Sequence, residues 1–189
     1  MKLLFIGDVV GKSGCDFLAA NIFKIKKEKG IDITVVNGEN SAQGNGMTKQ
    51  SAEFLLANGA DVITTGNHSF KRRESVSIYE ENDVVLRPSN YPEGVIGKGV
   101  TTLDMGRFSV AVINLMGVVY MEPIGNPFDE ADRLLKEIDT PNIFVDFHAE
   151  ATAEKKCMGQ YLKGRVTAVM GTHTHVQTAD ETIIDGHTA

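Results

Sequence analysis

The segment Val169-Met170-Gly171-Thr172-His173-Thr174-His175 decides the fold that we expect, because it joins an apolar run to two histidines. Residues 166–170 are typical of a buried strand, which we expect to end at Gly171. Residues i and i+2 of an extended segment point to the same side, so we expect His173 and His175 to face one pocket. Imidazole is the commonest metal ligand in proteins near neutral pH, although two loop histidines can also be held by local hydrogen bonds alone.

Other apolar runs of the chain also end in polar residues. They are followed by Asp8, by Glu39 and Asn40, by Asn67 and His68, and by His148. In α/β proteins, sites are built at the carboxyl ends of the strands. Each residue taken singly could be a helix cap, a turn residue or a hydrogen-bonded core histidine. Their joint placement instead predicts one site that gathers histidines, carboxylates and amides.

Strand-like runs alternate with helical patterns along the chain, which predicts an α/β fold. We expect strands at residues 3–6, 33–36, 62–65, 100–103, 108–115, 143–147, 166–170 and 182–184, with a short apolar run at 84–86. We expect helices at residues 13–29, 49–57, 72–81, 127–138 and 152–162, with Ser13 and Thr48 as caps of the first two. The strands at 100–103 and 108–115 predict an antiparallel hairpin. No repeat or linker divides the chain, so residues 1–189 are expected to form a single domain.

Composition bounds the class of protein. A length of 189 residues is enough for one domain with a full core. The composition, 42% hydrophobic and 23% charged, is ordinary for a globular protein. The net charge of −6 argues against a broad basic surface for DNA, while a local basic pocket for one phosphate stays compatible with it. Cys15 and Cys157 form no CxxC pair, which favours a reducing compartment. No export signal and no membrane-length apolar run is present, so we expect a cytoplasmic protein without membrane contact.

The candidate ligands offer nitrogen and oxygen atoms without a thiolate. Such a set suits manganese, iron, zinc or cobalt rather than calcium or magnesium. Their number suits two ions with one carboxylate between them, and two ions can clamp a phosphate and stabilise a leaving oxygen. We expect iron or manganese first and zinc as the alternative.

The segment Gly7-Asp8-Val9-Val10-Gly11-Lys12-Ser13 superficially resembles a phosphate-binding P-loop. A P-loop has four residues between its glycines, whereas this segment has three. The segment also places Asp8 where it would face the metals. We therefore do not expect nucleoside triphosphate binding here.

The ordered motifs of the chain resemble those of the calcineurin-like metallophosphoesterases. These motifs are Gly7-Asp8, Gly38-Glu39-Asn40, Gly66-Asn67-His68 and Gly171-Thr172-His173-Thr174-His175. The chain is more closely similar to the YmdB-like branch, whose members hydrolyse 2′,3′-cyclic nucleotides and related phosphodiesters. Two departures from the wider superfamily, Val10 in place of a histidine and Glu39 in place of an aspartate, are usual in that branch. Further phrases that look like the branch are Leu86-Arg87-Pro88-Ser89-Asn90, Asn114-Leu115-Met116-Gly117 and Asp146-Phe147-His148-Ala149-Glu150.

The resemblance implies a four-layer α/β/β/α sandwich with mixed sheets and a dinuclear metal site. One metal is then held by Asp8, Glu39, Asn40 and His175, and the other by Glu39, Asn67, His148 and His173. His68 is then the proton donor to the leaving oxygen. Members of the branch continue well beyond the position of Ala189, so we expect the C-terminal part of the fold to be missing while the metal motifs are present.

The implied function is that of a metal-dependent phosphodiesterase acting on 2′,3′-cyclic nucleotides or similar small phosphodiesters. The alternatives are a phosphomonoesterase on the same metals and a non-catalytic metal-binding regulatory protein. The sequence leaves the oligomeric state open, with a homo-oligomer among the alternatives.

Overall fold

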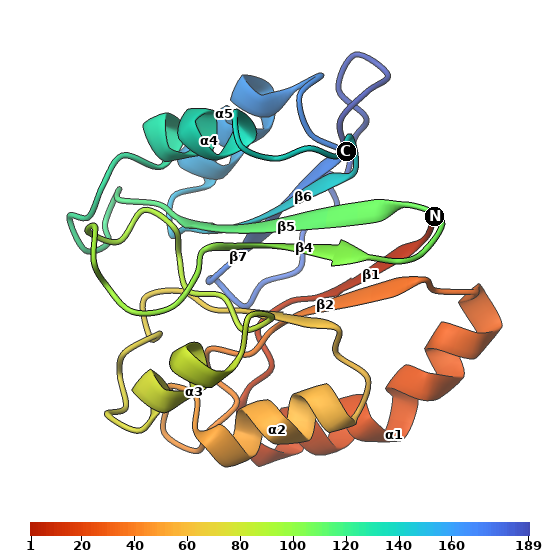
Figure 1. The fold of residues 1–189 in the computed structure, drawn as a ribbon, viewed down its shortest axis with the longest axis vertical. Helices are drawn as coiled ribbons and strands as arrows, with labels where there is room; N and C mark the ends of the chain where they lie inside the picture. The colour runs from red at the N-terminus through yellow and green to blue at the C-terminus, as the bar shows by residue number, and fades with distance from the viewer.

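The computed structural model describes residues 1–189 and places two β-sheets face to face between two layers of helices (Figure 1). The elements follow one another as β1 (Leu3–Ile6), α1 (Gly11–Lys29), β2 (Ile33–Asn37), α2 (Lys49–Ala57), β3 (Val62–Thr64), α3 (Ser75–Glu81), β4 (Val100–Asp104), β5 (Ser109–Met116), α4 (Pro127–Leu135), β6 (Ile143–His148), α5 (Thr152–Leu162) and β7 (Ala168–Thr172). The expected four-layer α/β/β/α sandwich is therefore confirmed.

The first sheet has the strand order β1-β2-β3 and is parallel throughout. The second sheet has the order β4-β5-β6-β7, in which β4 and β5 are antiparallel and the other pairs are parallel. The mixed character expected from the sequence thus belongs to the second sheet. The expected hairpin is present as β4 and β5, paired from Val100 with Ile113 to Asp104 with Ser109. Because the remaining strands run in parallel, their carboxyl ends lie together at one edge of each sheet.

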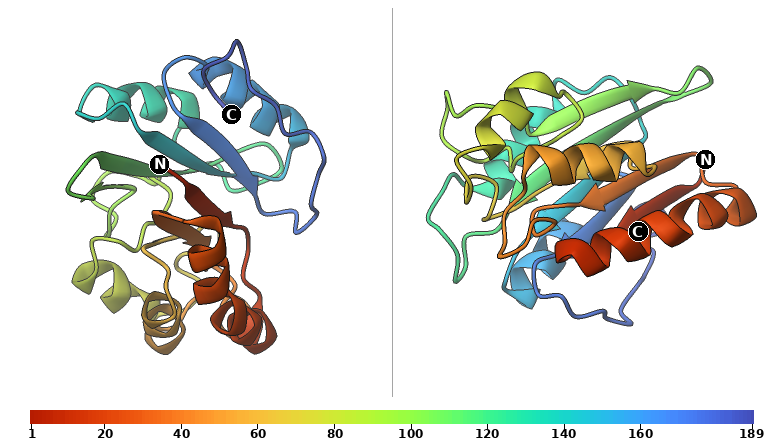
Figure 2. Two further views of the ribbon diagram at one scale, coloured as in Figure 1. Left: turned by 90° about the vertical axis from the view of Figure 1, so that its right-hand side faces the viewer. Right: turned by 90° about the horizontal axis from the view of Figure 1, so that it is seen from below.

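Alternate residues along each strand point to opposite layers, as the period of a pleated strand requires. Along β2, Val35 packs between the sheets while Val36 packs against the helices. Along β5, Val112 and Ile113 divide in the same way. The helices α1, α2 and α3 cover the outer face of the first sheet, and α4 and α5 cover the second, as the turned views also show (Figure 2). No helix is both long and apolar enough to cross a lipid bilayer.

The start of α1 differs from the expectation that Ser13 caps it. The helix begins at Gly11, and its flanking residue Val10 makes no side-chain cap. The N–H of Gly11 instead donates to the carbonyl oxygen of Asn40 at 2.8 Å. A backbone acceptor from a distant loop therefore does what a local side chain was expected to do. The expected cap of α2 is present, since Thr48 accepts from the N–H of Ser51.

Several other elements also differ from the expectations. The last strand does not end at Gly171: β7 continues to Thr172, which pairs with His148. The strand expected at 182–184 is only a single bridge from Ile184 to Thr188, because the chain turns at once through Asp185 and Gly186. The run at 84–86 makes only isolated bridges. The helices α3 and α4 are shorter than expected by about one turn each, which is a common feature of frayed ends.

Burial along α1 gives a first prediction. Ile22 is 1% exposed in the core beneath the first sheet, whereas Ile25 on the same helix is 36% exposed. We expect Ile22→Ala to lower the free energy of unfolding by about 2–5 kcal/mol, because a buried Ile→Ala change loses apolar burial and leaves a cavity. Ile25→Ala should cost clearly less. Urea denaturation of both variants checks this, and equal losses would contradict the packing described.

Candidate metal centre

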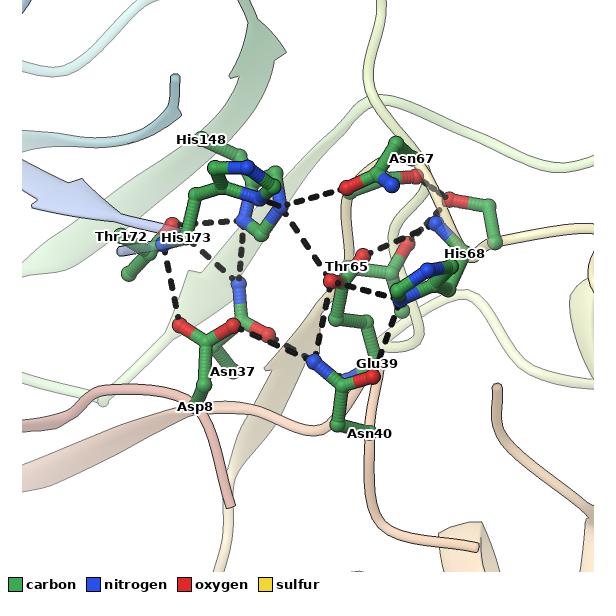
Figure 3. Close-up of polar contacts among 12 residues, drawn as sticks. Asp8, Asn37, Glu39, Asn40, Thr65, Asn67, His68, His148, Thr172 and His173 are labelled. Atoms are coloured by element: carbon green, nitrogen blue, oxygen red, sulfur yellow. Dashed lines mark hydrogen bonds and ion pairs between the residues drawn. The ribbon is translucent and has the colours of Figure 1, made fainter. Parts of the chain in front are cut away.

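The predicted site residues come together where the carboxyl ends of the two sheets meet. Asp8 follows β1, Glu39 and Asn40 follow β2, Asn67 and His68 follow β3, His148 ends β6, and His173 and His175 follow β7. Figure 3 shows the Glu39 carboxylate between the side chains of Asn40, His68 and His148. Each sheet thus contributes one side of the cluster, as the rule for α/β sites predicts.

Two glycines allow these loops to approach so closely. A Cβ at Gly66 would lie 2.1 Å from Cδ2 of His148, so only glycine lets the loop after β3 rest on that imidazole. A Cβ at Gly38 would lie 2.8 Å from Leu55 and 2.9 Å from Ile63, and its absence lets the chain turn directly after β2. The glycines before Glu39 and before Asn67 are therefore part of how the site is built.

His173 and His175 reach the site by a different route from the one expected. They do not lie in an extended segment, since their φ angles are +100° and +53°. The left-handed turns send them to different partners: Nδ1 of His173 lies 3.0 Å from Nε2 of His148, and Nε2 of His175 lies 3.0 Å from Oδ2 of Asp8. Non-glycine residues in this region of backbone space are strained, and such strain is concentrated at functional sites.

The inner part of the centre is a cluster of potential ligand atoms around Nε2 of His148. Nε2 of His148 lies 3.2 Å from Oε1 of Glu39, 3.1 Å from Oδ1 of Asn67 and 3.0 Å from Nδ1 of His173. One ligand atom from each of Glu39, His148 and His173 lies within 4.8 Å of the others. His148 is 0% exposed and Glu39 is 1% exposed. A single N–H cannot satisfy three acceptors, whereas one cation can, so these residues fit a metal ion.

The outer part of the centre is gathered around Asp8. Nδ2 of Asn40 lies 3.4 Å from Oδ2 of Asp8, 3.4 Å from Nε2 of His175 and 3.1 Å from Oε1 of Glu39. The amide nitrogen of Asn40 thus lies among these ligand atoms, while its oxygen is 2.9 Å from Nδ1 of His68. Asn40 can offer its oxygen to a cation here only after its amide turns over.

The electrostatics of the inner cluster favour ligation by Glu39 and His173. Burial alone would raise the pKa of Glu39, but the neighbouring imidazoles of His148 and His68 hold that pKa far below its usual range. Burial would lower the pKa of His148, and the Glu39 carboxylate outweighs it and raises that pKa. Burial and the neighbouring His148 lower the pKa of His173. Glu39 therefore stays ionised and His173 stays neutral, which are the forms that bind metals.

A buried carboxylate below the centre went unrecognised in the sequence. Asp146 is 0% exposed and accepts from Oγ1 of Thr64 at 2.5 Å, Oγ1 of Thr172 at 2.7 Å and Nδ2 of Asn37 at 3.0 Å. Burial raises the pKa of Asp146 to about 6, against the effects of His148 and these hydrogen bonds. The available signal was an aspartate inside an otherwise apolar strand, because buried charges are rare unless they have partners.

Two charged side chains at the rim were also missed. Oε2 of Glu150 lies 3.0 Å from Nε2 of His173, a contact that fixes the orientation of the imidazole. The stem of Lys155 passes over Gly171, where a Cβ would lie 2.8 Å from Cδ of the lysine. Nζ of Lys155 lies 3.4 Å from Oγ1 of Thr174 and forms no ion pair, while the charges of Glu150 and Asp8 act on it from nearby. The absence of a side chain at Gly171 therefore makes room for the Lys155 ammonium beside an otherwise acidic centre.

Comparisons with known proteins found one matching family and several similar chains. The YmdB-like protein family matches residues 4–189. A Bacillus subtilis protein named 2′,3′-cyclic-nucleotide 2′-phosphodiesterase is 46% identical over 100% of this chain, which spans 72% of that protein. A crystal structure of a hypothetical protein from Thermus thermophilus is 39% identical with a TM-score of 0.95, and the match covers 100% of this chain and 73% of that one. A crystal structure of a Mycoplasma pneumoniae protein described as a novel phosphatase is 31% identical with a TM-score of 0.92, covering 100% and 70%.

The position of Glu39 leads to a prediction on metal content. Its Oε1 is near both Nε2 of His148 and Nδ2 of Asn40, so it contacts both parts of the centre. We expect Glu39→Ala to lose metal from both parts, because a shared carboxylate offsets the repulsion between two cations. Elemental analysis of the purified variant is the measurement, with Glu53→Ala on the exposed surface of α2 as the control. Full occupancy in Glu39→Ala would exclude a shared role.

Proposed function

The chain belongs to the YmdB-like protein family, and we propose that it is a metal-dependent phosphodiesterase that hydrolyses 2′,3′-cyclic nucleotides or similar small phosphodiesters. The observation that carries the proposal is the convergence of Glu39, Asn67 and His173 on Nε2 of His148. The name of the Bacillus subtilis relative supports the ester class. On this proposal, residues 1–189 act as one metallophosphoesterase domain.

We propose two ions in the centre. Asp8, Glu39, Asn40 and His175 would hold one, and Glu39, Asn67, His148 and His173 would hold the other. The mixture of nitrogen and oxygen ligands supports iron or manganese, with zinc next. When bound, such a pair supplies Lewis-acid charge to a phosphodiester and to the attacking water.

The residues around the ions bind and orient the substrate. The ammonium of Lys155 at the rim supplies positive charge for an anionic ester, and no carboxylate forms an ion pair with it. Glu150 holds His173 through Nε2. A net charge of −6 argues against a DNA duplex as substrate and is compatible with a local pocket for one small phosphodiester. The unpaired Cys15 and Cys157 support a cytoplasmic location.

We propose His68 as the proton donor to the leaving oxygen. Its side chain is 21% exposed, and Nδ1 lies 2.9 Å from Oδ1 of Asn40. Nε2 has no hydrogen-bond or ion-pair partner in the protein, because Nδ1 makes both polar contacts of the ring. A leaving alkoxide needs a proton, and imidazole is the side chain suited to supply it near neutral pH. The contact with Asn40 also allows a different role, in which His68 merely orients that amide.

Loss of the His68 imidazole separates these two roles. We expect His68→Ala to keep its metal and to lose about 10²- to 10⁴-fold in turnover of cyclic nucleotides, which is the usual contribution of general acid catalysis. The loss should be smaller for bis(p-nitrophenyl) phosphate, because p-nitrophenolate leaves without a proton. Steady-state rates and elemental analysis are the measurements, and His187→Ala at an exposed position is the control. Equal losses on both esters together with lost metal would assign His68 to orienting Asn40.

Substrate class is tested by turnover of matched esters. We expect protein with measured metal content to hydrolyse bis(p-nitrophenyl) phosphate and a panel of 2′,3′-cyclic nucleotides faster than p-nitrophenyl phosphate. The physical reason is that a diester carries one negative charge, while a monoester brings two into a centre already lined by carboxylates. Faster turnover of the monoester would favour a phosphomonoesterase. Full metal content without turnover of any ester would favour a regulatory protein.

A further inference from the structure

We propose that Asp146 and Thr172 form a positioning pair that fixes the tautomer of His148, so that its Nε2 lone pair faces the metal centre. The inference rests on the proposed function only in taking His148 to be a metal ligand. Neither Asp146 nor Thr172 touches the centre itself, and both act through the far side of the imidazole. A metal-ligating histidine needs its other nitrogen held by a hydrogen-bond acceptor, and this pair supplies one.

The geometry of the Thr172 hydroxyl carries the argument. Oγ1 of Thr172 lies 2.7 Å from Oδ1 of Asp146 and 2.9 Å from Nδ1 of His148. A hydroxyl has one hydrogen to donate, and a carboxylate can only accept. The hydrogen therefore goes to Asp146, and a lone pair of the hydroxyl accepts from Nδ1–H of His148. A neutral imidazole held in this way has its proton on Nδ1 and its lone pair on Nε2.

The Asp146 carboxylate is fixed as an acceptor by its other contacts. Oδ2 accepts from Oγ1 of Thr64 at 2.5 Å and from Nδ2 of Asn37 at 3.0 Å. The Asn37 amide is a rival donor to Nδ1 of His148, but that separation is 3.5 Å, against 2.9 Å for Thr172. Hydrogen bonds weaken steeply at such lengths, so the hydroxyl is the preferred partner of the imidazole.

Strand pairing holds the three residues in line. His148 of β6 is paired with Thr172 of β7, so their side chains lie side by side on one face of the second sheet. Asp146 is two residues before His148 on the same strand and points to that same face. All three are at most 5% exposed, so water does not compete for these bonds. The register of one strand pair therefore decides which imidazole nitrogen faces the metals.

The opposite tautomer would block the centre. A proton on Nε2 of His148 would point among Oε1 of Glu39, Oδ1 of Asn67 and Nδ1 of His173. It would satisfy one of these and occupy the lone pair that a cation requires. The pair thus adds metal affinity without contributing a ligand atom.

The test uses variants that alter one hydrogen bond each. Thr172→Val removes the hydroxyl at nearly constant volume, and Thr172→Ser restores it. Thr64→Val is the matched control, because it removes another donor to the same carboxylate without touching His148. In Asp146→Asn we expect the amide nitrogen to face Thr172, where it displaces one donor rather than the two on the other oxygen. The Thr172 hydrogen then turns to Nδ1, and the tautomer inverts.

Two readouts are needed on the full chain. Nitrogen-15 NMR of the metal-stripped protein, at a pH where its histidines are neutral, reports the tautomer of His148. Competition with a chelator for zinc reports metal affinity. We expect Nδ1–H in the wild type, Thr172→Ser and Thr64→Val, and Nε2–H in Asp146→Asn. In Thr172→Val we expect Nδ1–H to lose its dominance and the affinity of one zinc to fall by about 10- to 100-fold, the usual effect of losing such a partner.

Several outcomes would overturn the inference. Thr172→Val with an unchanged tautomer and unchanged zinc affinity would do so, as would equal zinc losses in Thr172→Val and Thr64→Val. Nε2–H in the wild type would overturn this inference and leave the proposed function intact. A wild type with Nδ1–H that binds no zinc would overturn the proposed function and leave the tautomer assignment intact.

Discussion

The Asp146 carboxylate is the constraint on which the rest of the structure depends. It lies between the two sheets and is bonded by Asn37 and Thr64 from the first sheet and by Thr172 from the second. An unpaired buried charge is very costly, so the sheets cannot slide past one another without losing these bonds. The candidate metal centre adjoins this junction, because Thr172 contacts both Asp146 and His148. The same bonds that join the sheets thereby set the distances between ligands drawn from each of them.

The centre also depends on how closely the two sheets and their loops approach each other. The loop after β3 rests on His148 because Gly66 has no side chain. Asp8, Glu39, Asn40 and Asn67 come from the first sheet, whereas His148, His173 and His175 come from the second. Binding of an ion among them stabilises the paired sheets, because a ligand that binds only the folded state shifts the folding equilibrium. Stability and metal binding are therefore coupled in this fold.

The centre is a compromise between function and stability. Several groups that would be better solvated in water are crowded into a dry space, and Glu39 is held ionised there by two histidines. His173 and His175 have left-handed backbones that cost energy in non-glycine residues. The apolar layers on either side of the sheets supply the stability that offsets these costs. Similar compromises are expected wherever a protein preorganises a metal site.

The sequence by itself predicted which ligand-type residues gather at the candidate centre and in which order the elements follow. Periodicity and turn residues are local, so they showed the alternation of strands and helices, the cap at Thr48 and the polar residues after each strand. Chemical type then indicated a metal site, because few other centres gather histidines, carboxylates and amides at one edge.

Only the tertiary structure decided how these residues reach one another. Pairing of β7 with β6 carried the last strand past Gly171, and the backbone turns of His173 and His175 replaced the expected extended segment. The roles of Asp146 and Lys155 depend on residues far away in the chain or on another element, such as Asn37 and Gly171. Local patterns encode period and turn propensity but not the packing of one sheet on another. Contacts across that packing were therefore decided by the fold as a whole.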